Sequence, residues 1–140
     1  MPEIRPTDPA NGIISKLAPG TVTETVTRLS ELALARGMTV FTVIDHSGEA
    51  TRHGLDLRDT KVVVFGSPLG GTPVMVAAPL AALDLPLKVL VWDDGGQTIV
   101  SYTDPSVIAA RHHLDPDLAA RLAGIGPLTD QLTQPGPTSS

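Results

Sequence analysis

The chain has 140 residues, a formal net charge of -5 at neutral pH and no cysteine. A chain of this length forms one ordinary domain, which buries about two thirds of its unfolded surface and so sustains its own core. The acidic balance and the 3% aromatic content exclude the basic, stacking surfaces of nucleic-acid-binding proteins, and the missing cysteines exclude disulfides, thiolate zinc sites and thiol catalysis.

The two ends of the chain have the composition of tails. Prolines and an Asn-Gly pair punctuate residues 1–12, and TQPGPTSS at residues 133–140 has nothing apolar to bury. We therefore expect both to be disordered around a single domain at residues 13–132. No basic patch precedes an apolar run at the N-terminus, and no segment reaches about 18 consecutive apolar residues. We expect a cytoplasmic protein with no membrane or nucleic-acid partner and no cofactor.

An amphipathic helix is the clearest element of the first half. Between Thr21 and Gly37, apolar side chains recur at the spacing of one buried helix face. Thr21 or Thr23 can cap its start, and Gly37 suits a left-handed residue at its end. Strands are predicted on either side of it, over residues 13–17 and 38–44. The polar segment DHSGEATRHG that follows predicts a loop or a short helix.

The second half predicts three more strands, over residues 61–65, 87–92 and 98–102. The last two flank Asp94-Gly95-Gly96, which indicates a hairpin. Before them, Thr72-Pro73 is a good N-cap and first helical residue, so we expect one helix over residues 73–83 or two short ones broken at Pro79. Two further helices open at Asp-Pro pairs and are expected over residues 105–113 and 116–123.

The resulting order is β-α-β-β-α-β-β-α-α. Strict βαβ alternation fails, so the expected fold class is α+β, with a mainly antiparallel sheet of about five strands and helices packed on one side. The strands VVVF and LKVLVW carry apolar residues on both faces, whereas a sheet with one solvated face would alternate. We expect the second face to be covered by the C-terminal helices or by a second subunit, and we predict a homodimer.

The segment FGSPLGGTP raises the possibility of a phosphate-binding loop. Gly66 and Gly71 have the spacing of G-x-x-x-x-G-K-[ST], but Thr72 stands in place of the lysine and Pro73 in place of the hydroxyl residue. This rules against a nucleotide site. Gly70, Gly71 and Thr72 lead into a predicted helix N-terminus, whose free amides could hold an anion. The favoured alternative is a plain strand-to-helix turn with glycines at positive φ and Thr72 as the cap.

Four segments together resemble a known family: ETVTRLSELALARGMTVFTVIDHSGEA, FGSPLGGTPVM, LDLPLKVLVW and SYTDPSVIAARHHL. Their order and spacing look like the uncharacterised family called domain of unknown function 302, over about residues 21–132. The resemblance implies a TATA-box-binding-protein-like fold, a curved antiparallel sheet gripping a helix, and a tendency to dimerise. It implies no known activity. The family pattern has FGNP in place of FGSP and commonly a lysine near Leu69, and these losses argue against a bound anion here.

Asp45 and His46 are the candidate catalytic pair, because a carboxylate and an imidazole at a strand end could act as a general base. His46 and His53 are weak candidates for a metal site, which requires the intervening segment to bend. The favoured alternative is structural: Asp45 caps the next segment and His46 bonds to backbone. His112 and His113 are expected at a solvated helix end.

The predicted ligand-binding residues come from the glycine segment and from the strands. The strand residues could face a cleft, although one aromatic residue per predicted strand is also what core packing would give. The favoured function is a non-catalytic homodimeric module that binds a small apolar or weakly anionic ligand between the sheet and the helix after Thr72. The alternatives are a small hydrolase- or isomerase-like enzyme and a pure protein-interaction module. The ligand-binding set is Gly66, Gly70, Gly71, Thr72, Lys88, Trp92 and Tyr102.

Overall fold

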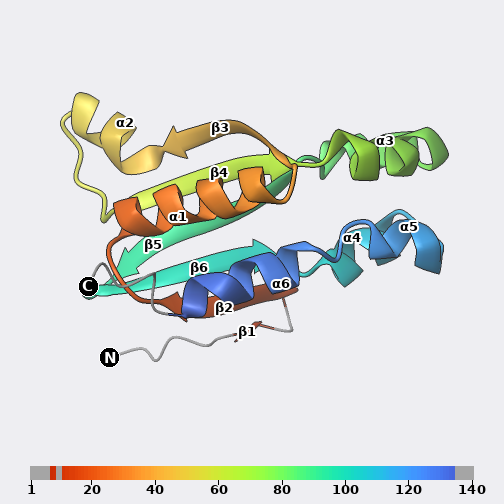
Figure 1. Cartoon of the computed structure of the whole chain (residues 1–140). Helices are drawn as coiled ribbons and strands as arrows, with labels where there is room; N and C mark the ends of the chain where they lie inside the picture. The colour runs from red at the N-terminus through yellow and green to blue at the C-terminus, as the bar shows by residue number, and fades with distance from the viewer. Residues whose placement is uncertain (1–6, 9–10, 135–140) are drawn as a thin grey trace.

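A single antiparallel sheet organises the protein. The computed structural model describes residues 7–8 and 11–134, and in this part of the chain six strands pair in the order β1-β2-β6-β5-β4-β3 (Figure 1). Every neighbouring pair is antiparallel, which confirms the predicted α+β class. The strands are β1 Thr7–Asp8, β2 Ile13–Ala18, β3 Thr39–Asp45, β4 Thr60–Gly66, β5 Leu87–Asp94 and β6 Gln97–Thr103.

Helices lie in two main places. Figure 1 shows α1 and α6 across one face of the sheet, while α3, α4 and α5 project beyond one end of it. We call the projecting part, residues 67–86 and 104–123, the arm. No helix in the described ranges is long and apolar enough to cross a membrane. The helices are α1 Val22–Ala35, α2 His46–Arg52, α3 Pro68–Ala77, η1 Pro79–Leu83, α4 Pro105–Arg111, α5 Pro116–Ala120, α6 Ile125–Asp130 and η2 Gln131–Thr133.

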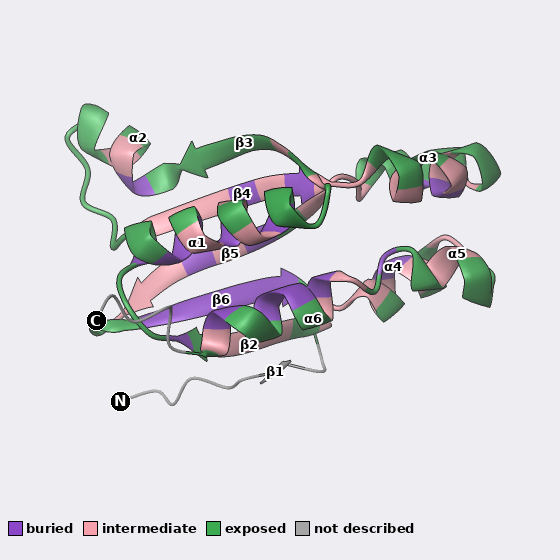
Figure 2. Cartoon of the chain, in the orientation of Figure 1, coloured by how far each residue is buried: buried purple, intermediate pink, exposed green. Residues whose placement is uncertain are grey.

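The helix α1 follows its sequence signals closely. The Thr21 side chain accepts from the Glu24 backbone N–H while the Glu24 side chain accepts from the Thr21 N–H, which is a complete capping box. Gly37 ends the helix at a φ of 77°. The buried face lies against the middle of the sheet, shown as purple segments in Figure 2. The main core under α1 contains Val22, Val26, Leu29, Ala33, Val63, Phe65, Val89, Val91, Val100 and Tyr102.

A lysine holds the C-terminal helix α6 on the same face. Lys16 of β2 donates to the hydroxyl of Thr129 at 2.7 Å and to the carbonyl of Gly126 at 3.1 Å, and it pairs with Asp130 at 2.8 Å. Partial burial alone would lower the pKa of Lys16, but the hydrogen bond to Asp130 and the neighbouring Tyr102 hold that pKa above its ordinary value. Neither α6 nor Lys16's role was predicted, because α6 contains a glycine and a proline and has no clear cap.

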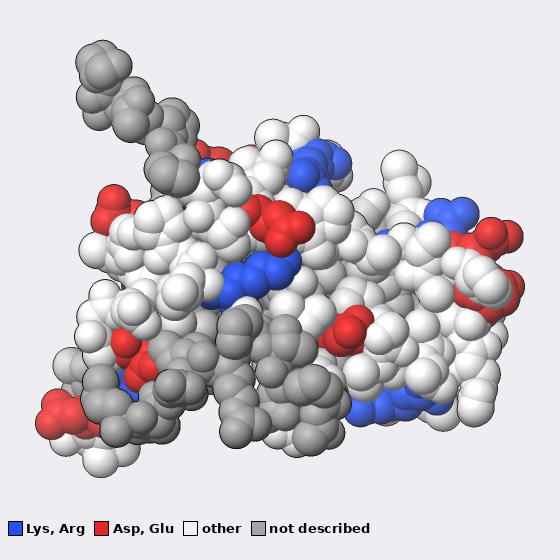
Figure 3. All heavy atoms as spheres, turned by 90° about the horizontal axis from the view of Figure 1, so that it is seen from below, with Lys and Arg blue, Asp and Glu red and all other residues white. Residues whose placement is uncertain are grey.

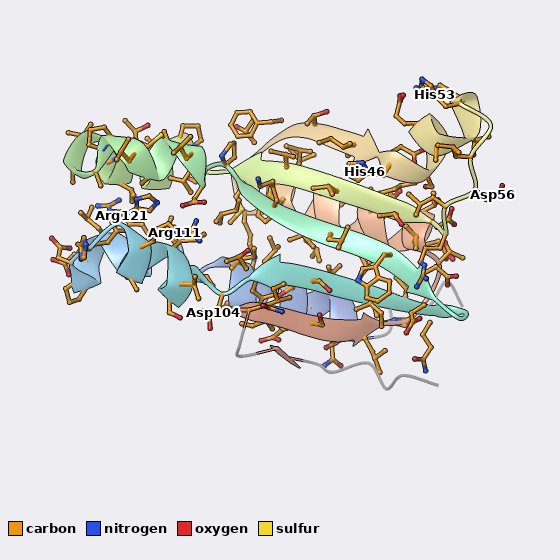
Figure 4. The ribbon with its side chains drawn as sticks, turned by 180° about the vertical axis from the view of Figure 1, so that it is seen from behind. His46, His53, Asp56, Asp104, Arg111 and Arg121 are labelled. Atoms are coloured by element: carbon orange, nitrogen blue, oxygen red, sulfur yellow. The ribbon has the colours of Figure 1, made fainter. Side chains whose placement is uncertain are left out.

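The second face of the sheet carries no helix in the described chain, as Figure 4 shows from behind. The expectation that the C-terminal helices cover it is wrong: α6 joins α1, and α4 and α5 belong to the arm. Trp92 lies on this face, and its indole Nε1 donates to Ser101 Oγ at 3.1 Å. Ile99, the pairing neighbour of Trp92, is fully buried. The other apolar residues that share this face are Ile13, Leu17, Ile44, Val62, Val64 and Leu90.

Helix α3 begins five residues earlier than predicted. Ser67 is its N-cap and accepts from the N–H of Gly70 at 3.2 Å, with Pro68 at the first helical position. Thr72 is therefore inside the helix and caps nothing. Gly70 and Gly71 do not have positive φ, so the predicted loop with left-handed glycines is also wrong. The predicted break at Pro79 is confirmed, because α3 ends at Ala77 and η1 starts at Pro79.

The hairpin and the two helices of the second half were predicted correctly, whereas the N-terminal end of the chain differs from the prediction. The hairpin between β5 and β6 is confirmed, with Gly95 and Gly96 both at positive φ. The helices at residues 105–113 and 116–123 appear as the shorter α4 and α5, each capped by the expected aspartate. Thr7–Asp8 pairs with β2, which the expected tail at residues 1–12 did not include. Two further parts of the predicted tails are described: the Gly12 carbonyl accepts from the Asp104 N–H at 2.8 Å, and Thr133 ends η2. Residues 1–6, 9–10 and 135–140 lie outside the described residues.

Candidate functional site

A cavity of about 360 Å³ lies where the arm meets the end of the sheet. Small-molecule sites commonly measure about 300–1,000 Å³, so the cavity has the size of a binding site for a small ligand. Most of its lining is apolar, and the polar side chains in it are those of Ser67, Thr72 and Arg121. The lining residues are Met38, Phe41, Gly66, Ser67, Pro68, Gly71, Thr72, Met75, Leu85, Pro86, Leu87, Arg121, Leu122, Gly124 and Ile125.

A β-bulge places an aromatic ring on the cavity wall. The register between β3 and β4 shifts between Val40 and Thr42, so Phe41 is the extra residue. Val40 packs against the main core, while Phe41 lines the cavity and is 52% exposed. A bulge re-aims a side chain in this way because it breaks the two-residue alternation of the strand. Core packing, one of the two alternatives for the aromatic residues of the predicted strands, therefore does not hold for Phe41.

Helix α3 forms the opposite wall of the cavity, and Gly71 leaves room there because it has no side chain. A Cβ atom there would lie 3.9 Å from Met75 Cε and 4.0 Å from Leu85 Cδ1, so a methyl group fits but a larger side chain would extend into the lining. Below α3, the second core of the protein holds the two halves of the arm together. Its buried residues are Val74, Ala81, Ile108 and Leu122.

Arg121 is the charged side chain of the cavity lining. It follows α5 as its C-cap, and Figure 4 shows it between α3 and α5. Its Nη1 donates to the carbonyl of Leu69 at 3.4 Å. That carbonyl is available because Pro73, four residues later, has no N–H to donate to it. No carboxylate of the described residues lies within ion-pair distance of Arg121.

An ion-pair cluster closes the arm beside the cavity. Asp84, at the end of η1, contacts His112 Nε2 at 2.6 Å and Arg111 Nη1 at 3.0 Å. The hydrogen bond from His112, followed by the charge of Arg111, holds the pKa of Asp84 below its ordinary value. The prediction of a solvated His112 is wrong, because its side chain is only 9% exposed. The cluster fixes the chain immediately before the Leu85-Pro86 wall.

Three of the predicted ligand-binding residues line the cavity and four do not. Gly66, Gly71 and Thr72 are in the lining, where the sequence placed the ligand between the sheet and this helix. Gly70 lies in the first turn of α3, outside the lining. The other three lie elsewhere: Lys88 and Trp92 are on the second sheet face, and Tyr102 is in the main core.

The candidate catalytic pair lies apart from the cavity. Asp45 is the N-cap of α2, where it accepts from Gly48 N–H at 2.9 Å and from Ser47 Oγ at 2.8 Å. The Gly48 N–H and the Ser47 hydroxyl hold the pKa of Asp45 below its ordinary value, which makes it a weaker base. His46 is exposed and outside the cavity lining.

The two histidines of the candidate metal site are not brought together. Figure 4 places His46 beside the sheet and His53 at the far end of α2. The Nδ1 atom of His53 is 3.0 Å from the carbonyl of Glu49 within that helix. Over residues 7–8 and 11–134, no group of three potential metal ligands occurs. On the face drawn in Figure 3, acidic and basic side chains are interspersed rather than gathered in one patch.

Residues 14–126 match the family described as domain of unknown function DUF302. The chain belongs to this family. An uncharacterised conserved DUF302 protein from Bacillus stearothermophilus has the same fold in its crystal structure, with a TM-score of 0.75, 20% identity and coverage of 87% of this chain and 95% of that one. The resemblance drawn from the four sequence segments is thereby confirmed.

Brucella proteins named as fluoride-specific ion channels are also similar. The chain is 36% identical over 124 residues to FluC 1 of Brucella suis biovar 1, a match covering 85% of this chain and 49% of that protein. The same identity and length hold for FluC 2 of Brucella melitensis biotype 1, with 46% of that protein covered. The DUF302 chain thus spans about half the length of the curated relatives it matches.

Sequence reasoning missed the residues that depend on long-range contacts. Nothing local distinguishes Arg121 from other surface arginines, because its environment is created by α3, some fifty residues earlier. The bulge at Phe41 follows from pairing with β4, which a strand pattern alone does not reveal. The available signal was the glycine-rich segment after an apolar strand, from which Gly66, Gly71 and Thr72 line the cavity.

The Asp84 cluster gives a testable consequence for the arm. Replacing Asp84 with Asn removes the charge that Arg111 and His112 contact, so we expect the free energy of unfolding to fall by about 1–2 kcal/mol. Because the folded pKa of Asp84 is depressed, its stabilisation is complete above the ordinary value of 3.8 and is lost as the pH falls below it. Urea unfolding at neutral and acidic pH measures both effects.

Asp117→Asn is the matched control on the same arm, since Asp117 is exposed on α5. We expect it to change stability by no more than about 0.5 kcal/mol. Equal losses for the two variants, or a loss for Asp84→Asn that does not shrink in acid, would contradict the assigned role of Asp84.

Proposed function

We propose that this DUF302 protein is a non-catalytic module that binds a small, mainly apolar ligand in the cavity between the sheet and the arm. The observation that carries the proposal is the 360 Å³ cavity itself. Apolar walls with a few polar groups are typical of small-molecule sites. Met38 and Met75 add flexible, polarisable surface that adapts to different ligand shapes.

Binding rather than catalysis is favoured by where the reactive side chains lie. Asp45 is engaged in capping α2, and His46 is exposed outside the cavity. The cavity lining contains no histidine, aspartate or glutamate. An enzyme using Asp45 and His46 would therefore need a second, separate substrate site. We propose that the protein acts in the cytoplasm, without a cofactor.

The proposal includes a homodimer formed through the second face of the sheet. Val62, Val64 and Leu90 are half-buried there, and Leu17 is 56% exposed. A continuous apolar sheet face is typical of an interaction surface. Two copies related by a twofold axis can cover each other with the same face, and this arrangement closes without further growth.

Filling the space at Gly71 tests the cavity directly. Gly71→Leu should abolish binding of a fluorescent apolar probe such as 1-anilinonaphthalene-8-sulfonate, because the new side chain enters the lining. Gly71→Ala is the matched control: its methyl group fits, so probe binding should persist while the helix gains about 0.5–1 kcal/mol. Fluorescence titration and thermal unfolding measure the two effects. Unchanged probe binding by folded Gly71→Leu would refute the proposed site.

The dimer is tested at the centre of the second face. The wild-type protein at micromolar concentration should scatter light as twice the chain mass of 14.6 kDa. Leu90→Lys should convert it to a folded monomer, since Leu90 is only half-buried within one chain. Leu57→Lys, at an exposed site in the loop after α2, should leave the dimer intact. A wild-type monomer would contradict the proposed interface.

A second candidate function is an interaction module for a membrane protein. The similarity to Brucella fluoride channels favours it, because there the matched region is about half of the named channel. The arm also exposes four large apolar side chains, which suits a docking surface. They are Leu69 at 87%, Val76 at 77%, Leu80 at 72% and Leu83 at 80% exposure.

This second function predicts binding between the chain and the remaining half of the Brucella suis relative, reconstituted in lipid nanodiscs. Leu80→Asp and Leu83→Asp should each weaken that binding at least several-fold, because each puts a charge into the apolar contact. Leu55→Asp, at a site 64% exposed in the loop after α2, is the control that should not. No binding by the wild-type chain would exclude this function.

A further inference from the structure

We infer that the ligand of the cavity is a monoanionic amphiphile: an apolar chain with one carboxylate or similar acidic head group held by Arg121. The inference rests on the proposed function and adds the charge of the ligand. It follows from three features of the cavity: an unpaired guanidinium, hydroxyl groups on the adjoining wall, and an apolar remainder of limited size.

The guanidinium of Arg121 supplies a positive charge to the cavity lining. Among the cavity-lining residues, Arg121 is the charged one, and its guanidinium meets no carboxylate of the described chain. The carbonyl of Leu69 takes one of its five N–H donors. Arg121 is exposed to solvent as well as lining the cavity, so its remaining donors are accessible to the acidic group of a bound ligand, and hydrogen bonds to an ionised partner are the stronger ones.

The first two turns of α3 add polar groups at the same end. Ser67 accepts from Gly70 N–H and keeps its own hydroxyl hydrogen for a ligand. Thr72 also lines the cavity, and within the described chain its hydroxyl has no hydrogen-bond partner. A methyl group at Gly70 would lie 3.7 Å from the carbonyl oxygen of Arg121, which shows how closely this turn approaches the end of α5. The acidic head group is therefore placed at the junction of α3 and α5.

The rest of the cavity specifies the body of the ligand. The apolar lining comes from Phe41 of β3, Met38 just before that strand, Ile125 at the start of α6 and Met75 of α3. A volume of about 360 Å³ lies at the lower end of the range for small-molecule sites, which limits the ligand to a small apolar body. A monocarboxylate of medium chain length, such as octanoate, fits both the volume and the single charge.

Isothermal titration calorimetry with three molecules of equal chain length tests the inferred charge of the ligand. Octanoate, 1-octanol and octylamine share the apolar body and differ only in the head group. We expect octanoate to bind about tenfold tighter than 1-octanol, which corresponds to one charge-assisted hydrogen bond, and octylamine to bind weakest. Arg121→Gln should reduce the preference for octanoate over 1-octanol to about one.

Arg52→Gln is the matched control, because it removes the same charge from α2, at a solvated site opposite the arm. It should leave the octanoate preference unchanged. If 1-octanol binds as tightly as octanoate, or if Arg121→Gln keeps the preference, the charge assigned to the ligand is wrong. In that case the proposed cavity still stands, provided that 1-octanol binds the wild-type protein and Gly71→Leu removes this binding. If none of the three molecules binds the wild-type protein, the proposed function fails together with the inference.

Discussion

The antiparallel pairing of β4 with β5 is the constraint on which the arm and the cavity depend. Phe65 pairs with Leu87, so the chain leaves the sheet at one point and returns to the same point 22 residues later. Residues 67–86 must therefore project beyond the sheet end. They contain no charged residue before Asp84, so burying part of this apolar segment is favourable. Packing of α3 against α4 and α5 buries part of this segment, and the unfilled remainder is the cavity.

Two prolines shape the segment in opposite ways. Pro68 starts α3 next to its Ser67 cap, where a missing N–H has no cost. Pro73 lies inside the helix, where its missing N–H leaves the Leu69 carbonyl to Arg121. The hydrogen bond from Arg121 to the Leu69 carbonyl thus connects α3 to the opposite half of the arm. This link places a cation beside an apolar space, even though the glycine segment itself contains no lysine or arginine.

Local signals predicted the elements whose structure is set locally. Helix α1 has a capping box, a regular apolar face and a terminal glycine, and all agree with its final form. The start of α3 shows the limit of such signals. Ser67-Pro68 and Thr72-Pro73 are equivalent as cap signals, and only packing against the rest of the arm selects the first. The largely buried side chain of His112 and the bulge at Phe41 could likewise not be predicted from local signals, because each depends on a partner far away in sequence.

Our central proposal, that a small ligand binds between the sheet and the arm, rests on the cavity rather than on the DUF302 membership or the similarity to the Brucella channels. Native mass spectrometry of the freshly purified protein, compared with its denatured mass, tests that claim most directly. The account predicts a dimer with extra mass that disappears on denaturation, together with release of an apolar monoanion. A native mass equal to a whole number of bare chains, unchanged after incubation with medium-chain carboxylates, would contradict it.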